Sequence, residues 1–322
     1  MPKVSILVPI YNASKYLRQA IDSLVNQTLQ DIEIICINDG SADNSLKIIE
    51  EYASKDARIV ILDKPNTGYG DSMNQGIKLA RGEFIAILEP DDYFELNAFE
   101  KLYQLANWHH ADIVKSNYFF LENEQNHQNA VIRPKDTGKI IYPRQDHFVF
   151  HLPPAIWSGI YRREFLLDNR LEFLPTPGAS YQDLGFNIKT LALAQRVILT
   201  TDAFLHYRVD NANSSSKSPS KLNCVVEEYS SIEDFLREHQ LMSDLAPTIV
   251  GVKFGNYLWN ILRLPAPAAQ EFYQTTLSEL RSARSSGLLQ RSAFLPKYWL
   301  LAQMMLKAPK LTKKFLIRSR ES

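Results

Sequence analysis

Three carboxylates gather at the end of an apolar run between residues 84 and 92. The residues from Phe84 to Leu88 are apolar or small, as in a strand buried within a parallel sheet, and Glu89, Asp91 and Asp92 follow directly. Ligands of open α/β sheets bind at the carboxyl ends of the strands. Carboxylates this close together repel one another, so the pattern indicates a site for a divalent cation. The alternative is a solvated acidic turn, with Asp92 near the start of the next helix.

Alternating strand and helix patterns precede this stretch and would position it. Apolar runs predict strands at residues 4–10, 32–38, 58–62 and 84–88. Between them, apolar residues recur at helical spacing in 16–25, 46–53 and 68–81. Strands that alternate with helices form a parallel, doubly wound α/β sheet, so the strand ends would meet at one edge.

The later chain is less regular. The patterns predict helices at 98–106, 163–169 and 182–194, strands at 113–120, 197–200 and 204–209, and an irregular excursion at 121–139. The serine-rich stretch 214–220 is the strongest change of composition, either a linker or a loop that closes over a ligand. Helical patterns follow it. We therefore predict two domains, residues 1–218 and a mostly helical 219–322.

Composition limits the function classes. The 322 residues hold 36 basic and 36 acidic side chains, so no global field favours nucleic acid as a partner. Two cysteines, Cys36 and Cys224, argue against a disulfide scaffold. The first residues show no signal-peptide pattern and no apolar stretch is long enough to span a bilayer, so we expect a cytoplasmic protein.

The segment 300–320 combines apolar residues at helical spacing with six basic residues. Such a helix could lie peripherally on the anionic inner face of the cell membrane. A solvated helix docked on its own domain fits the pattern equally well. The helical region could also assemble a homo-oligomer or shape one side of a binding site.

Several short motifs together resemble the family 2 glycosyltransferases with the GT-A fold. They are Val4–Asn12, Ile37–Ser41, Asn66–Gly68 with Asn74–Gly76, and Arg81–Ile85 leading to Glu89–Asp92. The similarity is close over residues 3–120 and looser to 218. It implies a GT-A Rossmann-like nucleotide-sugar-binding domain and a metal-dependent, inverting glycosyltransferase of hexosyltransferase type. The expected donor is a UDP-sugar, and the acceptor a glycan, lipid-linked or protein-linked hydroxyl in cell-surface polysaccharide or glycoconjugate synthesis.

The resemblance assigns donor-binding roles along the predicted edge. Asp39 would bind uracil, although an Asp that only shapes its turn is the alternative. Pro9 and Tyr11 end the first strand, where the aromatic ring could flank the base; the alternative is a tyrosine that only packs there. Gly68 and Asp71 open a helix whose N–H groups could face phosphate or ribose. We interpret Asn74 and Gly76, further along that helix, as structural residues that pack it against the sheet.

Glu89 and Asp91 occupy the outer positions of the family's Asp-x-Asp element, which implies contacts to ribose or metal for the first and to the metal for the second. Because glutamate moves the first carboxylate by one methylene, Asp91 is the stronger metal candidate. Arg208 could neutralise the diphosphate. His206 could complete the metal shell, or be an ordinary packed histidine. Carboxylate and phosphate oxygens suit Mn2+ or Mg2+.

The stretch from Tyr181 to Phe186 resembles the family's second acidic motif, with Gln182 where glutamate is usual. This implies that Asp183 is the catalytic base that takes the acceptor's hydroxyl proton. The alternative is an Asp favoured in the first turn of a helix by the helix dipole. Trp157 could stack on an acceptor sugar or belong to the core.

Two other functions are alternatives for a chain with these motifs. A nucleotidyltransferase would carry a glycine-rich, basic loop after the first strand, and residues 11–15 do not form one. A catalytically inactive nucleotide-sugar-binding or scaffold protein remains an alternative, because Glu89 and Gln182 depart from the family's pattern.

Overall fold

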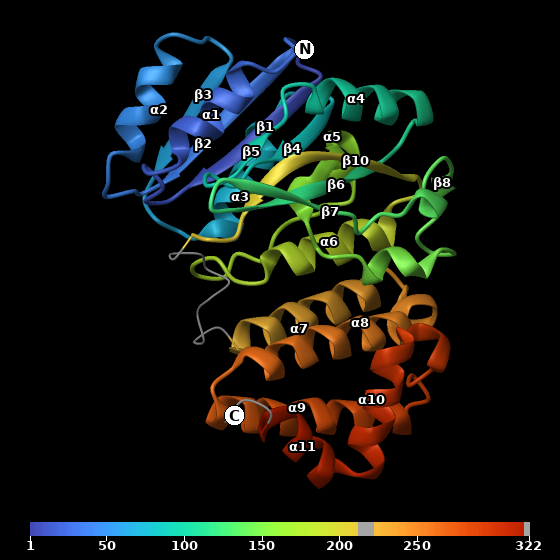
Figure 1. Ribbon diagram of the computed structural model, residues 1–322. Coiled ribbons are helices and arrows are strands. Elements are labelled where there is room, and N and C mark those ends of the chain that lie inside the picture. Colours follow the sequence, from blue (N-terminus) through green and yellow to red (C-terminus); the bar gives the residue numbers. More distant parts are fainter. Residues whose placement is uncertain (212–221, 319–322) are drawn as a thin grey trace. The chain divides into compact units, whose positions relative to one another are not determined.

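The computed structural model describes residues 1–211 and 222–318 (Figure 1). The chain divides into two compact units. The first comprises Met1–Pro143 with Leu152–Lys217, and the second comprises Arg144–His151 with Ser218–Ser322. The predicted break at 214–220 and the division at 218 lie outside the described residues, so this domain boundary stays a prediction.

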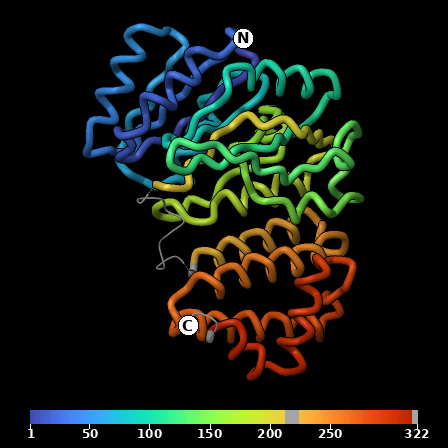
Figure 2. Tube along the Cα trace, in the orientation of Figure 1, coloured from blue at the N-terminus to red at the C-terminus, as the bar shows by residue number. Residues whose placement is uncertain are grey.

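The strands described in the first unit form one ten-stranded sheet in the order β3-β2-β1-β4-β9-β6-β10-β5, with β7 paired to β6 and β8 to β10. Their bounds are β1 Val4–Ile10, β2 Ile32–Asp39, β3 Ile59–Lys64, β4 Phe84–Ile87, β5 Tyr93–Phe94, β6 Ile113–Glu122, β7 Gln125–Asn129, β8 Ile140–Ile141, β9 Gly159–Arg162 and β10 Val197–Arg208. In Figure 2 the yellow trace of β10 lies beside the green trace of β6.

The sheet is mixed rather than parallel throughout. β1 pairs in parallel with β2 and β4, and β2 pairs in parallel with β3, as predicted for the first four strands. The next strand across is antiparallel, because β9 pairs in that direction with both β4 and β6. Apolar runs show that a strand is buried but not which way it points, so the sequence could not reveal this reversal.

Helices cover both faces of the sheet, and this is why β1 is buried at all seven positions. The helices are α1 Leu17–Val25, α2 Ser45–Ala53, α3 Tyr69–Leu79, α4 Ala98–His109, α5 Arg163–Asp168 and α6 Gln182–Leu193. Alternate residues of β1 form one core with α1, α2 and α4. On the other face α3 packs closely: a Cβ on Gly76 would lie 2.6 Å from Ile37 Cδ1 and 3.2 Å from Leu7 Cδ2. The predicted packing role of Gly76 is therefore confirmed.

Two predictions for the later part of this unit differ from the structure. The strands expected at 197–200 and 204–209 are one strand, β10, whose pairing with β6 is irregular between Leu199 and Leu205. The stretch 121–139, expected to be irregular, contains strand β7 paired with β6. Its turn places Asn123 and Glu124 at positive φ, as a two-residue hairpin requires, without the glycine that usually signals one.

The second unit is helical, as predicted. Its helices are α7 Leu222–Glu238, α8 Met242–Arg263, α9 Ala266–Ser285, α10 Pro296–Lys307 and α11 Pro309–Arg318. The single helix expected at 300–320 is two helices, since Pro309 disfavours a helical conformation at Ala308, where φ is −135° and ψ is 60°. No helix in the described ranges combines the length and the apolar character that crossing a bilayer demands.

The short segment Arg144–His151 belongs to the second unit although the chain reaches it from the first. Arg144 forms an ion pair with Asp244 at 2.5 Å, and His147 Nδ1 lies 2.7 Å from the hydroxyl of Thr248. Both partners are on α8, so this segment is fixed by contacts that sequence patterns do not reveal.

The two cysteines are not paired. Cys36 lies in the middle of β2 and is fully buried, and burial raises the pKa of its thiol to about 12. Cys224, on α7, is partly exposed.

Candidate active site

The ends of four strands meet at one edge of the sheet. The pairing register sets Ile10 of β1 against Asn38 of β2, and Asp39 against Lys64 of β3. On the other side of β1, Leu7 lies opposite Ile87, so Glu89 and the residues after it reach the same edge. Pro9 is buried within β1, and Tyr11 follows it with 57% of its surface exposed. An exposed ring at this point is free to stack on a ligand.

Asp39 holds the loop that follows β3. Its Oδ1 accepts hydrogen bonds from Lys64 Nζ at 2.5 Å and from the N–H of Thr67 at 2.9 Å. Its Oδ2 accepts the N–H of Gly68 at 3.0 Å. Asp39 therefore makes the contacts expected of a residue that shapes its turn. The N–H of a nucleotide base could bind this carboxylate only by replacing or sharing one of them. Asp71 also contacts this lysine, with its Oδ2 3.4 Å from Lys64 Nζ.

The first turn of α3 is covered by the segment 174–178. The N–H of Tyr69 donates to the carbonyl of Gly178 at 3.1 Å, and a Cβ on Gly70 would lie 2.2 Å from the carbonyl oxygen of Leu174. Asn74 fixes the start of this segment through both backbone groups of Phe173. The N–H groups of Gly68 and Tyr69, predicted to face phosphate, already have partners, so such a contact requires this segment to move.

Four carboxylates, those of Glu89, Asp91, Asp92 and Asp183, lie close enough to affect one another. Burial raises the pKa of Glu89 to about 8, and the charges of Asp91 and Asp183 add to the effect. The hydroxyl of Tyr69 donates to Glu89 Oε1 at 2.7 Å, and this hydrogen bond lowers the pKa of Glu89. The structure therefore brings together the two predicted acidic motifs, which are about ninety residues apart in the sequence.

Asp183 stands in the first turn of α6. Burial raises its pKa to about 6, against the N–H of Leu184, which donates to its Oδ1 at 2.8 Å, and against the positive charge of Lys115. Carboxylates with a pKa near the working pH are suited to accept a proton. Gln182, beside it, ties the preceding loop through Ser180, Thr176 and the carbonyl of Gly178. The side-chain amide of Gln182 both accepts and donates in these contacts, whereas an ionised glutamate at this position could only accept.

The carboxylate of Asp92 is buried and only half satisfied. Its Oδ1 accepts the N–H of Arg208 at 2.8 Å, whereas its Oδ2 has no hydrogen-bond partner in the part of the chain described. Burial, with the charge of Asp91, raises its pKa. Asp91 itself accepts the side-chain amide of Asn211 at 2.7 Å on Oδ2.

These carboxylates could contribute ligands to a divalent cation, although they do not form a complete protein-only metal site. Among residues 1–211 and 222–318 no three His, Cys, Asp or Glu side chains converge as a closed metal site. Magnesium and similar ions, however, often take only one or two protein carboxylates and complete their shell with phosphate oxygens and water. Burial raises the pKa of Glu89 and Asp92, and neighbouring carboxylates add to the effect. A cation held in this way would offset both causes. The oxygen donors suit Mg2+ or Mn2+.

Arg208, at the end of β10, is buried and held from several sides. Its Nε donates to the carbonyl of Asp91 at 3.1 Å, its Nη1 to Glu124 at 2.9 Å and its Nη2 to Gln19 at 2.8 Å. The guanidinium also lies over the ring of Tyr16, 4.5 Å from its centre. In this arrangement Arg208 fixes the loop that carries Asp91, a role that sequence reasoning did not anticipate.

The contacts of His206 are those of a packed histidine rather than of a metal ligand. Its Nδ1 lies 2.7 Å from Asn126 Oδ1 and its Nε2 lies 2.9 Å from Glu95 Oε1, so both ring nitrogens have partners. The ring is stacked between Tyr93 and Phe119, with ring centres 4.1 and 4.7 Å away. These contacts match the alternative of a packed histidine, and we do not carry the metal role forward.

Lys115 is a site residue that the sequence analysis missed. It lies on β6, is buried, and donates to the carbonyl of Ala155 at 2.5 Å and to the hydroxyl of Tyr161 at 3.2 Å. Burial lowers its pKa to about 7, against the charge of Asp183. The signal that could have revealed it is a lysine, followed by Ser116 and Asn117, inside a strand whose burial is indicated by Ile113 and Val114 before it and Tyr118 after it.

Trp157 packs against Tyr207, which lies close to the carboxylates of the site. Its ring is stacked on Tyr207 at 5.0 Å with an angle of 7° between planes, and meets the edge of Tyr118 at 4.6 Å. Burial raises the pKa of Tyr207, with added effects from Asp92, Asp91, Glu89 and Asp183. The tryptophan is half-buried, so it belongs partly to the core and keeps an exposed part beside the site.

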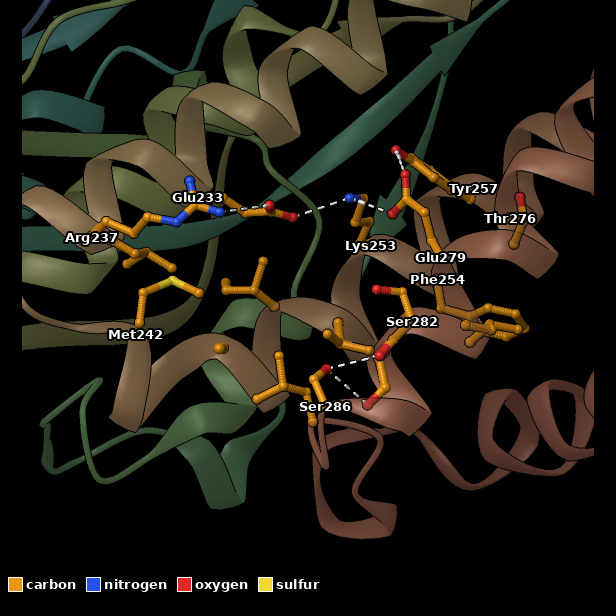
Figure 3. Close-up of a pocket in the computed structure, with 17 residues that line it drawn as sticks. Glu233, Arg237, Met242, Lys253, Phe254, Tyr257, Thr276, Glu279, Ser282 and Ser286 are labelled. Atoms are coloured by element: carbon orange, nitrogen blue, oxygen red, sulfur yellow. Dashed lines mark hydrogen bonds and ion pairs between the residues drawn. The ribbon is translucent and has the colours of Figure 1, made fainter.

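A cavity of about 360 Å³ lies elsewhere, within the second unit (Figure 3). It is lined mainly from α7, α8 and α9, with Ser286 and Leu288 just after α9. Lys253 lies between Glu233, at 3.1 Å, and Glu279, so two carboxylates neutralise its charge. The predicted site residues are not part of its lining, and we assign it no chemistry.

Comparisons with known proteins agree with this geometry. A family model described as Glycosyl transferase family 2 matches residues 5–168. The uncharacterized glycosyltransferase EpsJ of Bacillus subtilis (strain 168) is 34% identical over 235 residues, which is 69% of this chain and 65% of that protein. The chain therefore spans less than two thirds of the length of this relative.

Among solved structures, S. aureus TarS 1–349 in complex with UDP-GlcNAc matches with a TM-score of 0.61 at 19% identity, covering 95% of this chain and 92% of the other. The mannosyltransferase PcManGT from Pyrobaculum calidifontis, in complex with GDP-Man and Mn2+, matches with a TM-score of 0.53 at 14% identity, covering 96% and 88%. At these identities the likeness shows the fold, which is GT-A with a helical carboxyl-terminal region.

Proposed function

Because the chain belongs to glycosyl transferase family 2, we propose that it transfers a sugar from a nucleotide-sugar to a hydroxyl group of an acceptor. The observation that carries this proposal is the meeting of Asp183 with Glu89 and Asp91 at the edge of the sheet. The proposed donor is a UDP-sugar, since the matched TarS structure holds UDP-GlcNAc. The proposed acceptor is a glycan, or a lipid-linked or protein-linked hydroxyl, in polysaccharide synthesis.

The proposed reaction is a single displacement with inversion. Asp183 accepts the proton of the acceptor hydroxyl, the acceptor oxygen bonds to the anomeric carbon, and the bond from that carbon to the diphosphate oxygen breaks. Charge develops on the departing diphosphate, and hydrogen-bond donors and cations aimed at it lower the barrier. Asp39 and Tyr11 would hold the base, and Trp157 would face the acceptor sugar.

We further propose that Asp91, with Glu89 as a weaker second ligand, holds Mn2+ or Mg2+. When bound, the cation neutralises the diphosphate leaving group. Arg208 keeps the Asp91 loop in place through its contact with the Asp91 carbonyl, and Asp92 anchors the same loop to β10.

The test is slow donor hydrolysis across UDP-, GDP-, CDP- and dTDP-sugars, with Mn2+, Mg2+ or a chelator. We expect release of one nucleotide that the chelator abolishes. Asp91→Ala should lose metal-dependent release. Asp183→Asn should bind the donor normally but release the nucleotide about 10²- to 10⁴-fold more slowly, as expected for loss of a general base. Asp202→Asn, an exposed aspartate on β10, is the matched control and should behave as wild type.

Binding of a nucleotide-sugar without release in any sample would favour the inactive binding protein. Absence of binding to all four donors would overturn the assignment of Asp39 and Tyr11. Equal release by Asp183→Asn and the wild-type protein would remove Asp183 from the reaction.

A further inference from the structure

Positive charge is concentrated near the end of the chain. Residues 280–320 contain ten lysines and arginines and no aspartate or glutamate, whereas the whole chain holds 36 of each sign. The rest of the chain therefore carries an excess of ten acidic residues. A block of this kind is an electrostatic feature that a balanced total charge conceals.

The outer face of α10 carries apolar residues between lysines. Leu300 is 64% exposed and Met304 40%, whereas Ala302 and Met305 are fully buried. At 100° per residue, Leu300 and Met304 share one side of the helix and the two buried residues share the opposite side. Lys297 and Lys307, both exposed, fall on the same side as Leu300.

The outer face of α11 repeats this arrangement. Leu311 and Phe315 are each 66% exposed, and Thr312 and Leu316 on the other side are buried. Lys310 and Lys314 are exposed beside them. A solvated helix usually turns charged residues outward and apolar residues inward, so two successive helices with apolar residues on both sides need a further explanation.

The exposed apolar side chains gather in this unit. Seven of the fourteen large apolar side chains that are strongly exposed in the described part of the chain lie between Trp259 and Phe315. Trp259, at the end of α8, has the guanidinium of Arg263 at 3.7 Å over its ring. α10 and α11 pack against α8 and α9 through their inner sides, which leaves their outer sides to solvent (Figure 1).

We propose that the outer faces of α10 and α11 form a surface that binds an anionic phospholipid bilayer peripherally. We call this the lysine–leucine face, and it consists of Lys297, Leu300, Met304, Lys307, Lys310, Leu311, Lys314 and Phe315. Lysines attract the anionic headgroups, and aliphatic and aromatic side chains enter the boundary with the acyl chains. A second copy is disfavoured because two such faces would bring like charges together. The proposal stands independently of the proposed function.

The experiment is flotation of the full chain with vesicles of phosphatidylcholine alone and of a mixture with about one third phosphatidylglycerol. We expect binding to the mixture and not to phosphatidylcholine. Binding should weaken when salt is raised from about 0.1 M to about 1 M, because the Debye length falls from about 10 Å to about 3 Å.

Two double variants separate charge from apolar contact. Lys310→Glu with Lys314→Glu should reduce binding at least about tenfold, since each lysine near an anionic surface contributes about fivefold. Lys135→Glu with Lys139→Glu, exposed lysines of the first unit, is the matched control and should bind as wild type. Leu311→Ser with Phe315→Ser should also reduce binding about tenfold, whereas Trp108→Ser, which changes a side chain 80% exposed in the first unit, should not.

Donor hydrolysis and the unfolding temperature should be unchanged in all these variants, which keeps a folding defect and a failed functional proposal distinguishable from loss of membrane binding. Absence of binding to the anionic vesicles, or equal binding by the wild type and both variants, would overturn the proposal. So would a dimer without lipid that Leu311→Ser with Phe315→Ser converts to a monomer, because the face would then belong to a second copy.

Discussion

Burial gives the carboxylates of the proposed site different protonation states. At neutral pH a Glu89 with a pKa of about 8 is largely protonated when no cation is bound, whereas an Asp183 with a pKa of about 6 is largely ionised. Ionisation is what a general base requires. Environments that separate the pKa values of neighbouring carboxylates therefore support the roles proposed for them.

The rate of donor hydrolysis should fall in acid as Asp183 becomes protonated. Its pKa is raised by burial to about 6, so the ionised form is lost as the pH falls through that value. We expect a decrease of about tenfold between pH 7 and pH 5. The pH profile of kcat/KM checks this. The residual activity of Asp183→Asn should lack this acid limb, and a flat profile in the wild type would contradict the assignment.

Lys115→Met should move the acid limb to higher pH. The positive charge of Lys115 lowers the pKa of Asp183, so removing it leaves the effect of burial unopposed. The change should appear in the pH of half-maximal rate more than in donor affinity. Lys135→Met, on the surface, is the control. An unchanged profile with reduced stability would show that Lys115 only supports Ala155 and Tyr161.

At the residue scale the sequence predicted which side chains would meet but not what else each would contact. Asp91 and Asp183 are brought together as expected. Asp39 and His206, however, have hydrogen-bond partners that come from loops and strands far away in the chain, such as Thr67 for the first and Asn126 for the second. Such long-range partners depend on tertiary packing, which motif spacing does not encode.

At the scale of elements, close packing of α3 on the segment 174–178 should govern donor binding. Gly70→Ala would set a Cβ 2.2 Å from the carbonyl oxygen of Leu174, so the backbone must shift. We expect a loss of stability of about 1–3 kcal/mol and a changed donor affinity, because the displaced segment covers the N–H groups predicted to face the donor.

Chemical denaturation and donor titration would measure these effects. Lys78→Ala, on the exposed side of the same helix, loses only a surface ion pair with Glu172 and should cost about 1 kcal/mol or less. A Gly70→Ala protein as stable as this control would show that the segment yields easily.

The first four strands and their helices were predictable because apolar runs and helical spacing alternate there without interruption. The later elements were not. β7 is exposed at four of its five residues and shows no apolar alternation, and the direction of β9 follows from its neighbours. The predicted helix at 300–320 followed the apolar spacing alone, whereas Pro309 divides the segment into α10 and α11.

At the scale of the whole molecule, the two units should respond separately to local damage. Gly251→Ala in α8 would bring a Cβ within 1.9 Å of the carbonyl oxygen of Ala293. We expect faster amide hydrogen exchange in α8 and around residues 291–294, with β1–β4 unchanged, because compact units open as separate cooperative blocks. Exchange measured by mass spectrometry decides this, and acceleration throughout β1–β4 would show a single cooperative block.

Because Cys36 is buried in the central sheet, its reaction with a thiol reagent can report the opening of that sheet. A thiol reagent reacts with the ionised sulfur, and Cys36 in the folded protein is both inaccessible and un-ionised. Its modification can proceed only from molecules in which β2 has come away from β1 and β3. The rate of labelling at Cys36, compared with that at the partly exposed Cys224, would therefore measure how often the sheet opens, without a mutation or a probe having to be introduced.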